Sequence, residues 1–146
     1  GLVIVGSGPL RGAIEKQVTE SGMAGRIVFE PEQANVISHM KSAHVLVHLS
    51  EDSEEDVTVL EAASVRLPII GLNTGMVGTL FTNGESAFLC ESVDPSAVSR
   101  YLRMFLNDNS ARLQLAVRAE EVVFERVEQD YEAYLRSYRA SIERSL

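Results

Sequence analysis

Apolar positions along the chain fall into two patterns. Short continuous runs rich in Val, Ile and Leu are typical of buried strands. Segments with apolar residues at helical spacing separate these runs and follow the last one. The predicted strands cover residues 2–5, 26–29, 44–49, 67–72 and 87–90. The predicted helices cover residues 10–21, 33–42, 57–65, a segment from 95 onward, and 110–146. The last of these carries aromatic residues at roughly helical spacing, which predict a packing stripe: Phe124, Tyr131, Tyr134 and Tyr138.

This order of elements predicts the fold class. Continuous apolar strands that alternate with helices indicate a parallel sheet covered on both faces. We therefore expect an α/β domain with a doubly wound, Rossmann-like parallel sheet and further helices at its C-terminus. In such sheets ligands bind beyond the carboxyl ends of the strands. Asp94 is a candidate N-cap, and Pro95 fits the first turn of the helix that follows.

Composition excludes several classes of protein. The chain has 146 residues, which predicts one domain, and a net charge of −8, which argues against a generic nucleic-acid surface. The single cysteine, Cys90, lies in an apolar run and is expected in the core of a protein from the reducing cytoplasm. No apolar stretch approaches the roughly 20 residues of a membrane span. The three histidines are not at metal-ligand spacing, so no metal site is expected.

The first predicted strand ends in a glycine turn, "VGSGPLRG". Gly6 and Gly8 allow a ligand to approach the backbone, and Glu30 ends the next strand much as a ribose-binding acid would. This pattern favours a dinucleotide-dependent oxidoreductase. However, Pro9 removes an N–H donor from the turn, and a tight strand-to-helix turn explains the same glycines.

The segment "SEDSEEDVTVLEAASV" joins an acidic cluster to an apolar helix that carries one acid, Glu61. If the helix begins at Val57, the N–H groups of Val57 and Thr58 point toward the strand ends and suit a diphosphate. Glu61 lies one turn further in, and its carboxylate can accept two hydrogen bonds from a sugar diol. Helical spacing predicts that the packed face is made of four other residues: Val57, Leu60, Ala63 and Ser64.

A third segment, "NTGMVGTLFTNGESAFL", follows the fourth strand. Gly75 and Gly78 suit a loop that wraps a ligand, and Thr74 and Thr79 offer hydroxyl donors. An ordinary connecting loop explains this segment equally well.

Taken together, these segments resemble the C-terminal half of GT-B-fold glycosyltransferases. The likeness is to the large family of retaining, metal-independent enzymes that includes glycogen, sucrose and mannosyl transferases. It is carried, in order, by "VGSGP", "RIVFEP", "EDVTVLEAA", "LPIIG", "NGESAFL" and "DPSAVSRYL". Each piece is short, but they follow one another at the family's spacing along the whole chain.

The resemblance implies a binding site for a nucleotide-sugar donor. The family's "EA" acid, which holds the ribose hydroxyls, falls on Glu61. The same match implies three further groups of residues. The backbone N–H groups at the helix start, from Asp56, Val57 and Thr58, would face the sugar and the diphosphate. Gly75 and Met76 would line the sugar pocket, and Gly6, Ser7 and Gly8 would border the base and the phosphates.

The chain departs from the family pattern at several positions. An acid usually stands eight residues before the "EA" acid and holds the donor sugar, but that position here is Ser53. The neighbouring Glu54 could substitute for it. Arg66 replaces a glycine, and Thr79 replaces an acid. These departures keep a second hypothesis open, namely a noncatalytic relative that serves as a partner-binding module.

The resemblance also implies what residues 1–146 do not contain. The family's first strand, with an Arg and a Lys that neutralise the diphosphate, and the acceptor-binding N-terminal domain would precede Gly1. We therefore expect a donor-binding domain that is inactive by itself. The whole protein would use a UDP- or GDP-sugar without a cofactor or metal, in the cytoplasm, with peripheral membrane association allowed. Strand 2–5 should then be separated from strand 44–49 by the missing strand; direct pairing of the two is the alternative.

Overall fold

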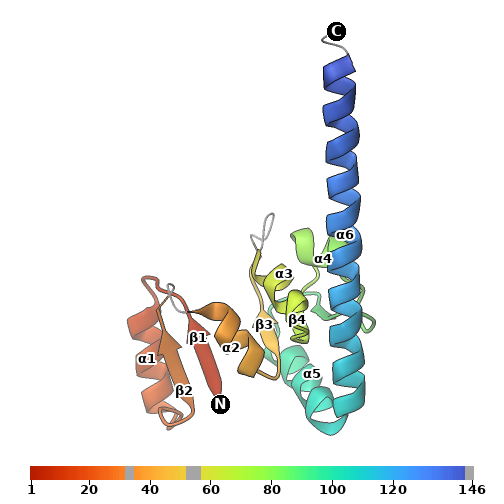
Figure 1. Cartoon of the computed structure of the whole chain (residues 1–146). Coiled ribbons are helices and arrows are strands. Elements are labelled where there is room, and N and C mark those ends of the chain that lie inside the picture. The colour runs from red at the N-terminus through yellow and green to blue at the C-terminus, as the bar shows by residue number, and fades with distance from the viewer. Residues whose placement is uncertain (32–34, 52–56, 144–146) are drawn as a thin grey trace. The chain divides into compact units, whose positions relative to one another are not determined.

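A computed structural model describes residues 1–31, 35–51 and 57–143 of the chain. The chain divides into two compact units, Gly1–His39 and Met40–Leu146. Their elements are labelled in Figure 1. Each unit is built around its own parallel sheet.

The first unit is a strand–helix–strand motif. It contains β1 (Leu2–Val5), α1 (Arg11–Glu20) and β2 (Ile27–Glu30). β1 and β2 are parallel, with Leu2 opposite Ile27 and the register kept to the last pair. Helix α2 (Val36–Ser42) follows and leads into the second unit.

The second unit holds a three-stranded parallel sheet in the order β3-β4-β5. Its strands are β3 (Leu46–His48), β4 (Ile69–Leu72) and β5 (Phe88–Cys90). The helices between and after them are α3 (Val57–Ser64), α4 (Gly75–Leu80), α5 (Pro95–Asn107) and α6 (Asn109–Glu143). Figure 1 shows α6 running beside the elements of this unit and continuing past them.

One face of this sheet packs on α5. Ile70 and Leu72 of β4 form a buried cluster with Tyr101 and Phe105 of α5. Phe88 stacks on Tyr101 with ring centroids 4.5 Å apart. The buried Tyr101 hydroxyl donates to the Leu89 carbonyl at 3.1 Å, so its one polar group is satisfied.

The opposite face carries Ile69 and Gly71, because side chains alternate along a strand. Ile69 is fully buried, and a Cβ on Gly71 would lie 2.8 Å from Cγ1 of Val77 in α4. Both faces of the sheet are therefore covered, as the sequence predicts for a doubly wound fold.

The packed face of α3 differs from the prediction. Val59, Ala62 and Ala63 are fully buried, whereas Val57 is 61% exposed and Ser64 is exposed. α6 packs against α3, so the buried side of α3 includes the surface that this distant helix covers. Helical spacing correctly predicted that α3 has one apolar face, but it did not predict which side of the helix is buried.

Two further predictions are corrected. Gly75–Leu80 is helical rather than a loop. Phe124 and Tyr131, expected in a packing stripe with Tyr134 and Tyr138, are 55% and 60% exposed. The face of α6 that is buried instead carries Leu115, Ala116, Ala119 and Val123. The side chains of Tyr134 and Tyr138 lie outside the described ones.

Burial also differs between the two sheets. All four residues of β4 are buried, as expected for an internal parallel strand. In β1, by contrast, Leu2, Val3 and Val5 are exposed by 37% or more. The hydrogen-bonded ladders form two sheets and not one continuous five-stranded sheet. The further strand expected before Gly1 stays a prediction.

Replacing Gly71 with Ala is expected to destabilise the domain by about 1–3 kcal/mol. The new methyl group would meet Val77, which is 1% exposed and has no room to move. Gly12→Ala is the control, because Gly12 lies in α1 and no atom is found within 4 Å of the place its Cβ would take. It should be neutral or stabilising by up to about 1 kcal/mol. Urea unfolding measures both, and equal stability of the two variants would contradict the packing argument.

Asp94 caps α5 as predicted. Its carboxylate accepts hydrogen bonds from the N–H groups of Ser96 at 2.9 Å and Ala97 at 3.3 Å. The Ser96 backbone hydrogen bond is the main reason that the pKa of Asp94 lies below its usual value of 3.8.

The lowered pKa of Asp94 makes part of the stability depend on pH. A carboxyl with a lower pKa in the folded state stabilises the fold above its unfolded pKa and loses that contribution as pH falls through the folded value. Asp94→Asn keeps an acceptor oxygen but cannot titrate. We expect the fall in Tm between pH 6 and pH 2 (about two units on either side of the usual Asp pKa) to be smaller in Asp94→Asn than in the unmodified protein. An equal fall in both would contradict this origin.

Candidate functional site

The second unit places two helix starts at one edge of its sheet. The strands are parallel, so their carboxyl ends share an edge, which we call the carboxyl edge. α3 begins at Val57 after β3, and α4 begins at Gly75 after β4. The carboxyl edge is where the doubly wound fold binds ligands. Five predicted donor-site residues are brought to it: Val57, Thr58, Glu61, Gly75 and Met76.

Helix α3 offers backbone donors and one carboxylate. Val57 is exposed at its start, and Thr58 is half-buried. Glu61 is half-buried one turn further along, next to the fully buried Ala62. The first N–H groups of a helix lack partners within the helix and carry a partial positive charge. This arrangement can bind an anion at the helix start and hydroxyl groups at Glu61. The predicted residues Ser53, Glu54 and Asp56 lie outside the described residues.

Helix α4 lies close to Asn73, the residue that follows β4. A Cβ on Gly78 would lie 2.7 Å from Oδ1 of Asn73 and 2.8 Å from its carbonyl carbon. Gly78 therefore allows α4 to approach Asn73, which is a packing role and not the ligand contact expected from the sequence. Gly75 has φ 52, a conformation that glycine adopts readily. Gly75 is exposed and Met76 half-buried at the carboxyl edge.

One polar pair at this edge was not predicted from the sequence. Nδ2 of Asn73 donates to Oε1 of Glu91 at 3.0 Å, and the Asn73 N–H donates to the Cys90 carbonyl at 2.8 Å. Both residues follow strands directly, which is the only signal that could have singled them out. They are 18 positions apart, and pairing of β4 with β5 brings them together.

The glycine turn of the first unit has different chemistry. Gly6 has φ 136, and its N–H already donates to the Glu30 carbonyl at 3.1 Å. Ser7 and Gly8 are exposed, and no atom lies within 4 Å of a Cβ position on Gly6 or Gly8. The turn therefore leaves room for a ligand, but the Gly6 N–H is not available to a pyrophosphate. Gly6, Ser7 and Gly8 belong to the other unit and are described separately from α3 and α4.

The nearest cation to this turn is already engaged. Nε of Arg11 pairs with Glu15 at 2.8 Å, and its Nη1 donates to the Gly6 carbonyl at 3.4 Å. The same guanidinium lies 5.5 Å from the centre of the Phe29 ring. Arg11 thus stabilises the turn.

The start of α3 offers an anion a partial positive charge from its backbone. The chain as a whole carries a net charge of −8. An anionic ligand is therefore repelled at long range, which lowers its association rate. The partial charge at the start of α3 acts only within about one helical turn. Such a site discriminates by local geometry and not by overall attraction.

Other candidate chemistry is limited in the described part of the chain. Cys90 is 2% exposed, and burial raises the pKa of its thiol, so it behaves as a core residue. Within residues 1–31, 35–51 and 57–143 no group of three or more His, Cys, Asp or Glu could hold a metal ion. None of the described helices is both long and apolar enough to cross a membrane.

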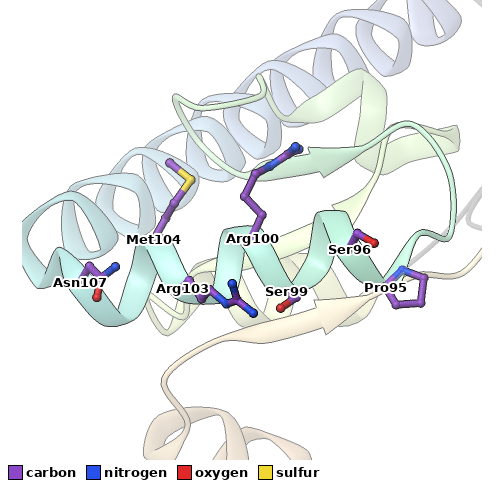
Figure 2. A pocket seen from close by; sticks show the side chains of 7 residues that line it. All are labelled: Pro95, Ser96, Ser99, Arg100, Arg103, Met104 and Asn107. Carbon is purple, nitrogen blue, oxygen red and sulfur yellow. The ribbon is translucent and has the colours of Figure 1, made fainter.

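A surface hollow of about 580 Å³ lies along α5. All the residues that line it come from that one helix (Figure 2). Arg100 and Arg103 point to different sides of α5 in Figure 2, so their charges do not converge on one position. The hollow does not form a binding site of its own.

Comparison with protein families gives a match over most of the chain. The family model described as "Glycosyl transferases group 1" matches residues 1–122. The match includes every predicted donor-site residue and ends within α6.

Two similar relatives are bacterial enzymes. The chain is 28% identical over 124 residues to N-acetyl-alpha-D-glucosaminyl L-malate synthase of Bacillus anthracis, covering 85% of this chain and 32% of that protein. It is 30% identical over 124 residues to 2-deoxystreptamine N-acetyl-D-glucosaminyltransferase of Niallia circulans, covering 82% of this chain and 32% of that protein. The chain thus spans about a third of the length of these relatives.

Solved structures share the fold. Anabaena Alr3699/HepE, solved in complex with UDP, superposes with a TM-score of 0.81 at 18% identity, over 92% of this chain and 40% of that one. The C-terminal domain of the group 1 glycosyl transferase LpcC from Francisella tularensis gives a TM-score of 0.71 at 18% identity, over 80% of this chain and 61% of that one.

Proposed function

The chain belongs to the glycosyl transferases group 1 family, and we propose that it is the donor-binding domain of a retaining, metal-independent glycosyltransferase. In the whole protein this domain would bind a nucleoside diphosphate sugar, and a second domain would bind the acceptor. The observation that supports the proposal is α3, which begins at Val57 after β3 and carries the half-buried Glu61 one turn further along.

The proposed role of α3 follows from its chemistry. The backbone N–H groups of Val57 and Thr58, with Asp56 before them, would face the diphosphate at the positive end of the helix dipole. Glu61 would accept hydrogen bonds from both ribose hydroxyls, and hydrogen bonds to a charged group are about twice as strong as neutral ones. Its half-buried position suits this role, because partial exclusion of water strengthens such bonds.

The remaining donor contacts are assigned by the same match. Gly75 and Met76 would line the sugar pocket, and Gly6, Ser7 and Gly8 would border the base and phosphates. Ser53 or Glu54 would face the sugar hydroxyls. The donor class is supported by the relative Alr3699/HepE, which was solved both with UDP and with UDP-glucose. We therefore place a UDP-sugar first and a GDP-sugar second.

Charge on the leaving diphosphate must be neutralised for transfer to occur. Arg11 is engaged with Glu15 and the Gly6 carbonyl, so it does not supply this charge. We assign the role to an Arg and a Lys outside residues 1–146, as the family pattern implies. It follows that residues 1–146 alone would bind a donor weakly and transfer nothing.

A noncatalytic, partner-binding relative is the second candidate. It is favoured by Ser53, which stands where the family usually has an acid. The oxidoreductase hypothesis has little support, because the Gly6 N–H is bonded to Glu30 and the family match covers the same turn.

The first test measures thermal unfolding of the intact protein with ligands. We expect UDP-glucose, UDP-N-acetylglucosamine or a GDP-sugar to raise Tm, because a ligand that binds only the folded state stabilises it. NADH at the same concentration should leave Tm unchanged. Protection by NADH alone would contradict the proposal. A rise in Tm with a sugar nucleotide but no transfer or hydrolysis of it would favour the noncatalytic relative.

The second test concerns Glu61. Glu61→Ala and Glu61→Gln should weaken donor binding by about 10- to 100-fold, which corresponds to loss of hydrogen bonds to a charged group. Folding should change little, since the Glu61 side chain is only half-buried. Glu121→Ala is the matched control, because Glu121 is an exposed helical glutamate paired with Arg118. Isothermal titration calorimetry measures Kd, and unchanged affinity in both Glu61 variants would remove Glu61 from the site.

A further inference from the structure

The C-terminal end of α3 has the hydrogen bonds of a Schellman motif. The Leu67 N–H donates to the Ala62 carbonyl at 2.9 Å, and the Arg66 N–H donates to the Ala63 carbonyl at 3.0 Å. Arg66, at the left-handed position of the motif, has φ 56. Glycine is the usual residue at this position, because a Cβ disfavours the left-handed conformation. Arg66 is the only non-glycine residue with positive φ in the described part of the chain.

Arg66 also forms an ion pair. Nε of Arg66 lies 2.7 Å from Oε2 of Glu120 in α6. The Glu120 side chain is only 17% exposed, whereas that of Arg66 is 62% exposed. The two residues are 54 positions apart, so the pair joins the end of α3 directly to α6.

The packing between these helices explains why such a connection matters. The buried face of α3 carries Val59, Ala62 and Ala63, and the buried face of α6 carries Leu115, Ala116, Ala119 and Val123, so four of these seven side chains are alanine methyl groups. The two helices pack against each other. Small side chains allow close approach but interlock less than large ones, so they fix the position of one helix along the other less firmly. A guanidinium and a carboxylate, by contrast, pair in a defined geometry.

We propose that Arg66 is a positioning residue, which through Glu120 fixes α3 on α6 and thereby holds Glu61 in place at the carboxyl edge. The proposal rests on the donor-binding function proposed above. It assigns to Arg66 an effect on donor affinity, although Arg66 lies at the end of α3 remote from the ligand.

The test uses the intact protein, four single variants and the double variant Arg66→Gln/Glu120→Gln. Arg66→Gln and Glu120→Gln remove the ion pair, and Arg66→Gln keeps the backbone cost of a non-glycine residue. Arg66→Lys keeps both the charge and that cost. Arg126→Gln is the matched control, because Arg126 forms an exposed ion pair with Asp130 on α6 alone. The measurements are Kd for UDP-glucose, Tm, and amide hydrogen exchange of residues 57–64 without ligand.

We expect Arg66→Gln and Glu120→Gln each to raise Kd by about three- to tenfold, with the double variant no worse than either, since coupled residues are not additive. Amide exchange in α3 should quicken in both. Arg126→Gln should stay within about twofold of the unmodified protein, and Arg66→Lys, which keeps the charge but not the fork geometry of the guanidinium, should have a Kd between that of Arg66→Gln and that of the unmodified protein. A merely structural role would lower Tm and leave the Kd of the folded protein unchanged, and that result would overturn the proposal.

The exchange measurement separates this proposal from the proposed function. If the unmodified protein binds no sugar nucleotide, the donor-binding function fails. Faster exchange of residues 57–64 in Arg66→Gln than in Arg126→Gln would still support the positioning role. Equal exchange in those two variants would contradict it whether or not a donor binds.

Discussion

Burial of β4 is the constraint on which the second unit depends. All four of its residues are inaccessible, and it pairs with β3 on one side and β5 on the other. Ile70 and Leu72 meet the aromatic cluster of α5, while Gly71 leaves room for Val77 on the other face. Because β3 and β5 are paired with β4, the position of β4 also sets where their carboxyl ends lie. The starts of α3 and α4 are therefore positioned mainly by the packing of the sheet.

The strands and the fold class could be predicted because a continuous apolar run is a strong local signal. The Asp94 cap could be predicted for the same reason, since its partners are two and three residues away. Helix α4 could not, because its six residues include two glycines and no long apolar period. It is held by the approach of Gly78 to Asn73, which depends on the position of the strand before it.

The features that the sequence could not supply depend on distant partners. Which face of α3 is buried depends on α6, which begins only at Asn109. The Asn73–Glu91 contact depends on the register of β4 and β5. Arg66 could be recognised as a departure from a glycine, but its partner Glu120 could not be identified from spacing. Among the donor-site residues, Glu61 and Val57 could be assigned to the correct helix, because the segment that contains them also shows the apolar spacing of that helix.

Ion pairs within α6 support the helix locally, in addition to its packing on α3. Arg118, Arg126 and Arg136 each pair with an acid three or four residues away on the same helix. Pairs of this kind stabilise a helix without any tertiary contact. A surface that docks on the outer part of α6 would thus meet a helix that these pairs already favour. They would offset part of the conformational entropy of about 1–2 kcal/mol that fixing each backbone residue costs.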